Sequence, residues 1–198
     1  NADRTFVASS ATISADATDS GDGGKVIVWA DGDTRFHGSI SAMGGRNGGD
    51  GGFVEVSGKQ QLGFDGYVDT SAALGEMGTL LLDPDDLFVA ALPVGGATED
   101  TTNPFTAIDG VNNYFVLGTT LTALPVNTGV VLQANNNIIF QTSLVMPTTP
   151  AGSMTLTAGN GIQMAGFDLS TAGANVSMTA SSCSNDVSRS QRMSVAHT

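Results

Sequence analysis

Residues 51–57, which read GGFVEVS, decide the fold, because they repeat the pattern of residues 23–29, GGKVIVW, 28 positions earlier. Each copy joins a double glycine to a run in which apolar residues alternate with others. A third run, residues 79–83 (TLLLD), follows Gly78. Alternation with a period of two is typical of a β-strand with one buried face, and glycine supplies the backbone conformations that sharp turns need. We therefore predict three copies of one strand, each entered through a turn.

Shorter segments repeat between these strands. Residues 11–15 (ATISA) and 38–42 (GSISA) lie 27 positions apart, and each leads into a glycine-rich stretch. Residues 34–37 (TRFH) and 62–65 (LGFD) follow the main strands. Further along, an apolar–polar–apolar rhythm recurs at spacings of 24 and 22 positions, in residues 130–134, 154–158 and 176–180.

A repeat unit of this length cannot bury the apolar face of its strands alone. Stacking successive units in parallel pairs each strand with its copies one coil earlier and one coil later, and encloses a continuous core. We therefore predict an all-β protein, a right-handed parallel β-helix (β-solenoid). Short strands bounded by turns also suit a sandwich or a barrel, but the repetition of strand sequence every 22–28 residues disfavours both.

The predicted β-helix spans residues 1–180. Between residues 85 and 128 the rhythm loosens around Pro93, Pro104 and Pro125. Proline cannot donate to a β-ladder, so we interpret this region as a coil that carries a proline-rich excursion. Residues 181–198 lose the alternation, and we interpret them as a tail or end cap.

Composition excludes several classes of partner. The chain of 198 residues has a net charge of −12, and no Lys or Arg occurs between residues 60 and 188. Nucleic-acid binding depends on basic side chains that neutralise phosphates, so we expect no nucleic-acid partner. No apolar run approaches the roughly 18 residues of a membrane span, so we expect no membrane insertion. With 26 glycines and only 13% charged residues, the chain does not resemble an ordinary helical enzyme.

Three sub-motifs in order, residues 24–38, 48–59 and 78–84, resemble the repeat region of filamentous-haemagglutinin-like exoproteins. These are large surface adhesins that Gram-negative bacteria export by two-partner secretion. The resemblance is close over residues 10–84 and looser over residues 129–180. It implies a right-handed parallel β-helix, secretion to the extracellular space or the bacterial outer surface, and service as a stalk or adhesive surface. It supplies no catalytic residues, and the outer-membrane secretion partner would act through a domain that is not present here.

Asp83, Asp85 and Asp86 form the densest group of carboxylates. β-Helix polysaccharide lyases and hydrolases use clustered acids for acid/base chemistry, so an enzyme of this kind is the alternative function. The strand end before them and Pro84 between them favour a solvated turn instead. Asp65 and Asp69 lie on either side of Gly66, and their spacing likewise fits a turn.

The other candidate residues also favour structural roles. The Gly/Asp-rich stretches 20–24 and 44–52 superficially resemble calcium-binding repeats, but their period is three times too long, so we predict turns. His37, His197 and Cys183 have no co-ligand or catalytic partner nearby in sequence. We therefore assign no catalytic, cofactor-binding or metal-binding residue, and no cofactor.

Two surface hypotheses remain. Trp29 alternates with Ile27 and either packs in the core, which the large apolar ring favours, or faces outward to a sugar ring. The threonines of residues 154–157 suggest an ice-binding face, but Gln133 and Ser177 interrupt the array in neighbouring coils.

The sequence therefore predicts a non-enzymatic, secreted, adhesin-like segment. It would present an extended β-helical surface to a host-cell or matrix glycan or protein. Exposed strand edges at the ends of a β-helix also favour self-association, so filaments are expected.

Overall fold

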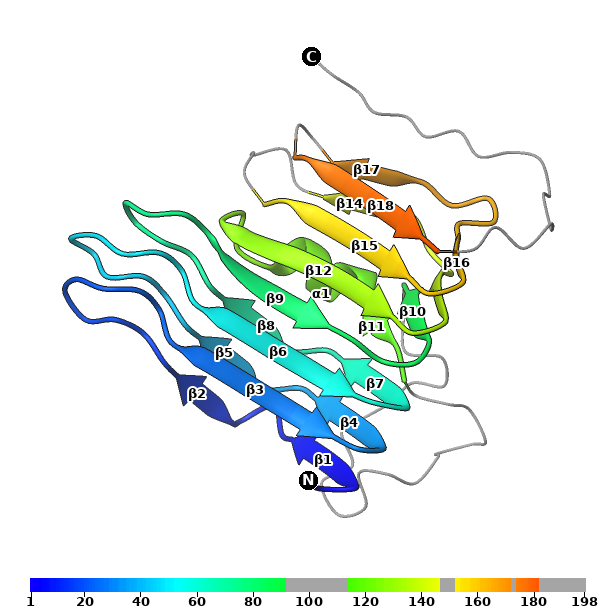
Figure 1. The fold of residues 1–198 in the computed structure, drawn as a ribbon, viewed down its shortest axis with the longest axis horizontal. Helices are drawn as coiled ribbons and strands as arrows, with labels where there is room; N and C mark the ends of the chain where they lie inside the picture. The colour runs from blue at the N-terminus through cyan, green and yellow to red at the C-terminus, as the bar shows by residue number, and fades with distance from the viewer. Residues whose placement is uncertain (92–113, 147–151, 172–173, 182–198) are drawn as a thin grey trace.

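A computed structural model describes residues 1–91, 114–146, 152–171 and 174–181. In these residues every paired strand runs parallel to its partner, and consecutive passes of the chain stack into coils (Figure 1). The strands of the front sheet in Figure 1 run from left to right, and the chain returns behind them while rising toward the C-terminus. The path is therefore that of a right-handed parallel β-helix, and the fold prediction is confirmed.

The strands form three faces. The front sheet has six strands: β3 (Lys25–Ala30), β6 (Phe53–Gly58), β9 (Gly78–Leu82), β12 (Thr128–Ala134), β15 (Met154–Ala158) and β18 (Val176–Ala180). The back sheet has seven, in the spatial order β1 (Arg4–Val7), β4 (Asp33–Phe36), β7 (Gln61–Phe64), β11 (Val116–Leu117), β10 (Leu87–Ala90), β13 (Asn137–Phe140) and β16 (Gly161–Gln163). The third face holds β2 (Thr12–Ser14), β5 (Ser39–Ser41) and β8 (Tyr67–Asp69), then helix α1 (Gly118–Ala123), and finally β14 (Leu144–Met146) and β17 (Leu169–Thr171).

In the front sheet, equivalent positions of the sequence repeat pair with one another from coil to coil. Val54 pairs with Val26 in the coil before it and with Leu80 in the coil after it. The same inward-facing position continues through Val130 and Met154. The stacked positions form one continuous core. Burial of each large apolar side chain in it contributes about 1.5–3 kcal/mol to the free energy of folding.

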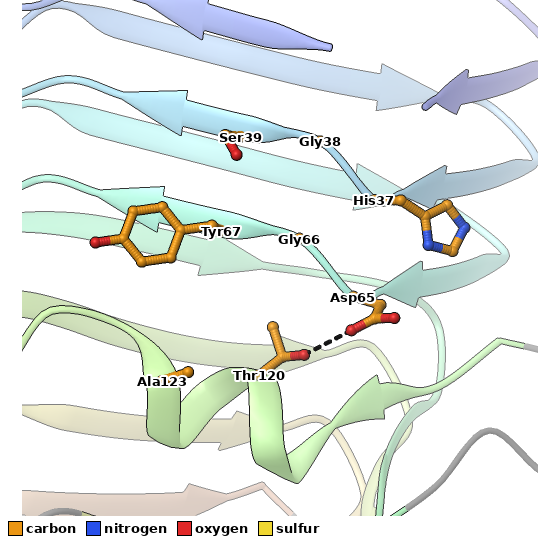
Figure 2. Close-up of a pocket in the computed structure, with 8 residues that line it drawn as sticks. All are labelled: His37, Gly38, Ser39, Asp65, Gly66, Tyr67, Thr120 and Ala123. Atoms are coloured by element: carbon orange, nitrogen blue, oxygen red, sulfur yellow. Dashed lines mark hydrogen bonds between the residues drawn. The ribbon is translucent and has the colours of Figure 1, made fainter. Parts of the chain in front are cut away.

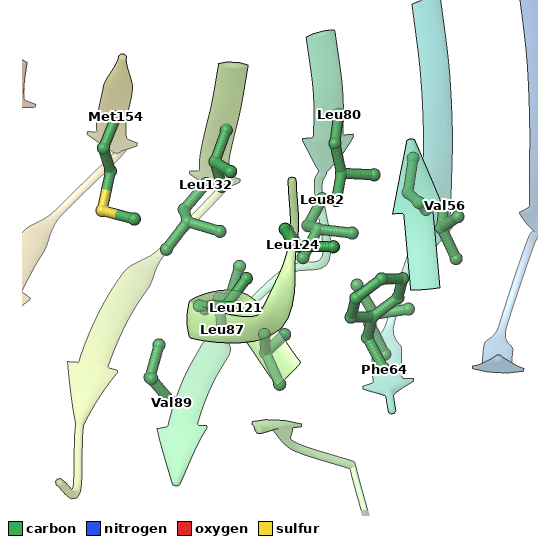
Figure 3. Packing of buried hydrophobic residues seen from close by; sticks show 14 of the residues in the cluster. Val56, Phe64, Leu80, Leu82, Leu87, Val89, Leu121, Leu124, Leu132 and Met154 are labelled. Carbon is green, nitrogen blue, oxygen red and sulfur yellow. The ribbon is translucent and has the colours of Figure 1, made fainter. Parts of the chain in front are cut away.

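Aromatic rings extend this stacking into the back sheet. Phe36 and Phe64 are fully buried in neighbouring coils, and their rings stack with centroids 5.7 Å apart. Figure 3 shows Phe64 in the core near Val56 of the front sheet.

The fourth coil departs from the repeat. Strand β11 lies between β7 and β10, where Val116 pairs with Phe64 on one side and with Val89 on the other. In the front sheet β6 and β9 pair directly, so the back sheet gains a strand that the front sheet lacks. Helix α1 takes the place of a strand on the third face and buries Leu121 among the leucines of the front and back sheets (Figure 3).

The predicted excursion at residues 85–128 therefore contains regular elements. Strand β10 occupies an ordinary coil position and pairs with β13, and β11 and α1 lie at the other end of the predicted region. Residues 92–113, and the predicted tail from residue 182 onward, lie outside the described residues.

The glycine-rich stretches form loops that project from the front sheet in the first coils (Figure 1). A backbone hydrogen bond closes the base of each loop: Gly24 N–H donates to Ala15 O at 2.7 Å, Gly52 N–H to Ala42 O at 2.8 Å, and Gly78 N–H to Thr70 O at 2.8 Å. The loops also stack on one another, as when Gly21 N–H donates to Gly48 O at 2.8 Å. The loops therefore continue the coil-to-coil bonding of the sheets.

No helix within the described part of the chain is long and apolar enough to cross a membrane.

Candidate functional site

The clustered carboxylates are held by amide groups of the next coil. Gln133 Nε2 donates to Asp83 Oδ2 at 3.1 Å, and Asn135 Nδ2 donates to Asp85 Oδ1 at 2.8 Å. Asp86 Oδ1 accepts hydrogen bonds from both N and Nδ2 of Asn137, each at 3.1 Å. The carboxylates that follow β9 thus form a ladder of hydrogen bonds with the amides at and after the end of β12 in the next coil. This ladder supports the interpretation of the segment as a structural turn.

Asp83 lies in a partly buried environment that shifts its pKa. Burial raises its pKa, the nearby charge of Glu55 raises it further, and the hydrogen bond from Gln133 acts in the opposite direction. Glu55 and Asp83 lie on the outer side of neighbouring strands, two residues out of register. Sequence reasoning missed Glu55, because its proximity to Asp83 follows from the register of β6 and β9.

Asp65 and Asp69 are not brought together in one site. Asp69 Oδ1 accepts a hydrogen bond from Ser71 N at 2.9 Å, as in a local turn. Asp65 Oδ1 accepts one from Thr120 Oγ1 of helix α1 at 2.8 Å. Each carboxylate therefore has its own role.

The Gly/Asp-rich loops use their carboxylates to hold successive coils together. Asp22 Oδ1 accepts from Asp50 N, and Asp50 Oδ1 accepts from Glu76 N, both at 2.8 Å. Arg46 and Asp19 form an ion pair between adjacent loops. The described residues contain no group of three or more His, Cys, Asp or Glu side chains placed to hold a metal ion. The observed bonds support the prediction that these stretches are turns.

Trp29 lies on the outer side of the front sheet, so its expected packing in the core is wrong. Its neighbours Val28 and Ala30 are the buried residues, and the indole Nε1–H donates to Asp31 Oδ1 at 3.2 Å. The register places Gln133 beside Thr157 and Ser177 beside Thr155, which confirms the expectation that a threonine array is interrupted in the neighbouring coils.

A shallow pocket of about 250 Å³ lies at the corner between the back sheet and the third face. Its lining comes from three successive coils: His37, Gly38 and Ser39; Asp65, Gly66 and Tyr67; and Thr120 and Ala123 of helix α1 (Figure 2). Cys183 and His197 lie outside the described residues.

The pocket exists because the chain turns sharply at two stacked glycines. A Cβ atom at Gly66 would lie 2.4 Å from the ring of Phe36, and one at Gly38 would lie 2.8 Å from Ala11 O. Only glycine fits where the backbone approaches these atoms so closely. The side chains that flank each glycine, His37 and Ser39 in one coil and Asp65 and Tyr67 in the next, point outward and away from each other (Figure 2). This leaves a furrow over the glycine backbone.

Helix α1 forms the third wall. Thr120 reaches Asp65 across 55 residues of sequence, and the helix is anchored by the buried Leu121. Nothing in the strand repeat indicates a helix at this position, so sequence reasoning could not place Thr120 in the pocket.

The polar groups of the pocket do not form a nucleophile–base pair. In Figure 2 the imidazole of His37 lies at the opposite end of the pocket from the Tyr67 ring and points away from the Ser39 hydroxyl. The His37 ring instead packs against Phe6, with centroids 5.9 Å apart. Tyr67 is 43% exposed, and partial burial together with the charge of Asp69 raises its pKa, so the phenol stays protonated at neutral pH. The pocket therefore offers hydrogen-bonding groups and one open aromatic ring.

Comparison of the chain with known protein families and with curated protein sequences finds no match.

Proposed function

We propose that this chain is a non-enzymatic, adhesin-like segment of a secreted protein, whose role is to present the outer surface of a rigid β-helix to a binding partner. The single observation that carries the proposal is the carboxylate–amide ladder. The acids best placed for chemistry, Asp83, Asp85 and Asp86, are hydrogen-bonded to the next coil and hold the scaffold together. The resemblance of residues 10–84 to filamentous-haemagglutinin-like repeats supports the same role, with export by two-partner secretion.

The alternative function is a polysaccharide-active enzyme, and one observation favours it. The raised pKa of Asp83 beside Glu55 is the kind of perturbation that a general acid requires. The two functions are separated by incubating the protein with bacterial and host polysaccharides, then measuring both co-sedimentation and release of soluble oligosaccharide. Retention without product supports the adhesin. Product that disappears in Asp83→Asn establishes the enzyme instead.

Self-association into filaments is part of the proposal. Among the described residues β18 pairs only with β15, and its inward side chains Val176 and Met178 are only partly buried. An unpaired strand edge is a template for another strand. Sedimentation velocity at increasing concentration, with electron microscopy of the same samples, tests this. A monomer without fibres at high concentration contradicts it.

A further inference from the structure

The corner pocket combines features that suit one small polar ligand. Two hydroxyl groups, Ser39 and Thr120, and one carboxylate, Asp65, line it together with the partly exposed ring of Tyr67. An ionised carboxylate has about four acceptor positions, and Asp65 uses one of them for Thr120. The side chain is exposed, so its remaining acceptor positions can reach a ligand that carries hydroxyl groups.

Tyr67 supplies the complementary apolar contact. A tyrosine ring offers an apolar face and a polar tip, and this ring borders the furrow over Gly66 (Figure 2). A ligand with an apolar C–H face and hydroxyl groups at its rim matches this combination. A pyranose ring has both.

The volume of the pocket and the negative charge of the protein limit which ligands fit. At about 250 Å³ the pocket is smaller than the roughly 300–1,000 Å³ typical of sites for drug-sized molecules, which suits a single sugar unit. The carboxylate in the pocket and the net charge of −12 repel sulfated or carboxylated sugars. An uncharged hexose is therefore the favoured ligand.

We infer that this pocket, lined by Asp65, Tyr67 and Thr120, binds one uncharged hexopyranose unit of a glycan chain. The inference rests on the proposed binding function and gives it a location. Asp65 accepts hydrogen bonds from sugar hydroxyls, Tyr67 stacks on a C–H face of the ring, and Thr120 holds the Asp65 carboxylate in place.

The test uses the whole chain with neutral gluco-, galacto- and manno-oligosaccharides of four residues, and a heparin-derived tetrasaccharide as the anionic comparison. Saturation-transfer NMR detects binding, and amide shifts of Gly38 and Gly66 locate it. Tyr67→Ala and Asp65→Asn are expected to weaken binding of one neutral series at least tenfold. Asn can still accept the hydrogen bond from Thr120, so Asp65→Asn keeps the fold. Leu74→Ala, which removes a side chain that is 74% exposed and is not part of the pocket, is the matched control.

Each outcome separates this inference from the proposed function. Neutral sugar binding that survives both pocket variants overturns the inference and leaves the adhesin proposal supported. Preference for the anionic tetrasaccharide, or no binding by the unmodified chain, also overturns the inference. The filament and polysaccharide experiments then decide the proposed function independently.

Discussion

At the scale of single residues, the tightest constraints lie in the stacked loops. Gly48 and Gly49 are neighbours with positive φ, at +134° and +125°, which side-chain-bearing residues rarely adopt. A Cβ at Gly48 would meet nothing within 4 Å, whereas one at Gly49 would lie 1.9 Å from Gly21 O in the loop of the previous coil. Substitutions at these two positions therefore distinguish the cost of backbone strain from the cost of a close contact between coils.

Alanine at these two positions should have unequal effects. Gly48→Ala should cost about 1–3 kcal/mol in the free energy of unfolding, from backbone strain alone. Gly49→Ala should cost clearly more, because the loops must also move apart. Urea unfolding followed by circular dichroism measures both. Equal midpoints for the two variants would show that the loops are not stacked as described.

Asp83 should make the folded protein less stable as pH rises. Its folded pKa is raised above 3.8, mainly by burial, so the stability that it contributes is complete below the unfolded pKa and is lost as pH rises through the folded pKa. Asp83→Asn should remove this loss and be at least as stable as the unmodified chain at pH 7. Thermal melts between pH 3 and 7 test this, with the exposed Asp65→Asn as control.

Asp16 should make the folded protein less stable as pH falls. Burial favours a higher pKa, but hydrogen bonds from Met43 N–H and from the Ser41 and Ser14 hydroxyls outweigh it and lower the pKa below 3.8. Its contribution is present above the unfolded pKa and is lost as pH falls through the folded pKa. Asp16→Asn should therefore be less stable than the unmodified chain at pH 7, and the difference should shrink in melts below pH 4.

At the scale of elements, the strands were predictable and the helix was not. Strands β3, β6 and β9 coincide with the predicted runs, because alternation and flanking glycines are local signals. Helix α1 has the sequence GTTLTA, with three threonines, which are poor helix formers, and no side-chain cap. Burial of Leu121 and Leu124 in the core stabilises it, and that depends on chain segments far away in sequence. The corner pocket was missed for the same reason.

Leu121→Ala tests the role of the helix. It should cost about 2–5 kcal/mol, because it leaves a cavity under α1 where the side chain is fully buried. Val126→Ala, at a position that is 38% exposed, is the matched control and should change stability little. Chemical denaturation of both variants is the measurement. A small effect at Leu121 would mean that α1 does not anchor the third face.

At the scale of the whole molecule, the ladders between coils distribute stability along the axis. In a solenoid each coil contacts only its neighbours, so stability is approximately a sum over adjacent pairs. Hydrogen exchange should therefore protect the middle strands β6, β9 and β12 more strongly than β18, which is paired on one side in the described residues. Uniform protection of all front-sheet amides would contradict this.

The extra strand β11 has a geometric consequence. The back sheet has six strands from β4 to β16, where the front sheet has five from β3 to β15, because β11 lies between β7 and β10. With generic spacings of about 4.8 Å between strands and about 10 Å between sheets, one additional strand on one side would tilt the coils on either side by on the order of 25°. We therefore expect the long axis to bend at the fourth coil, with the front sheet on the concave side, so that the two ends of the molecule face different directions.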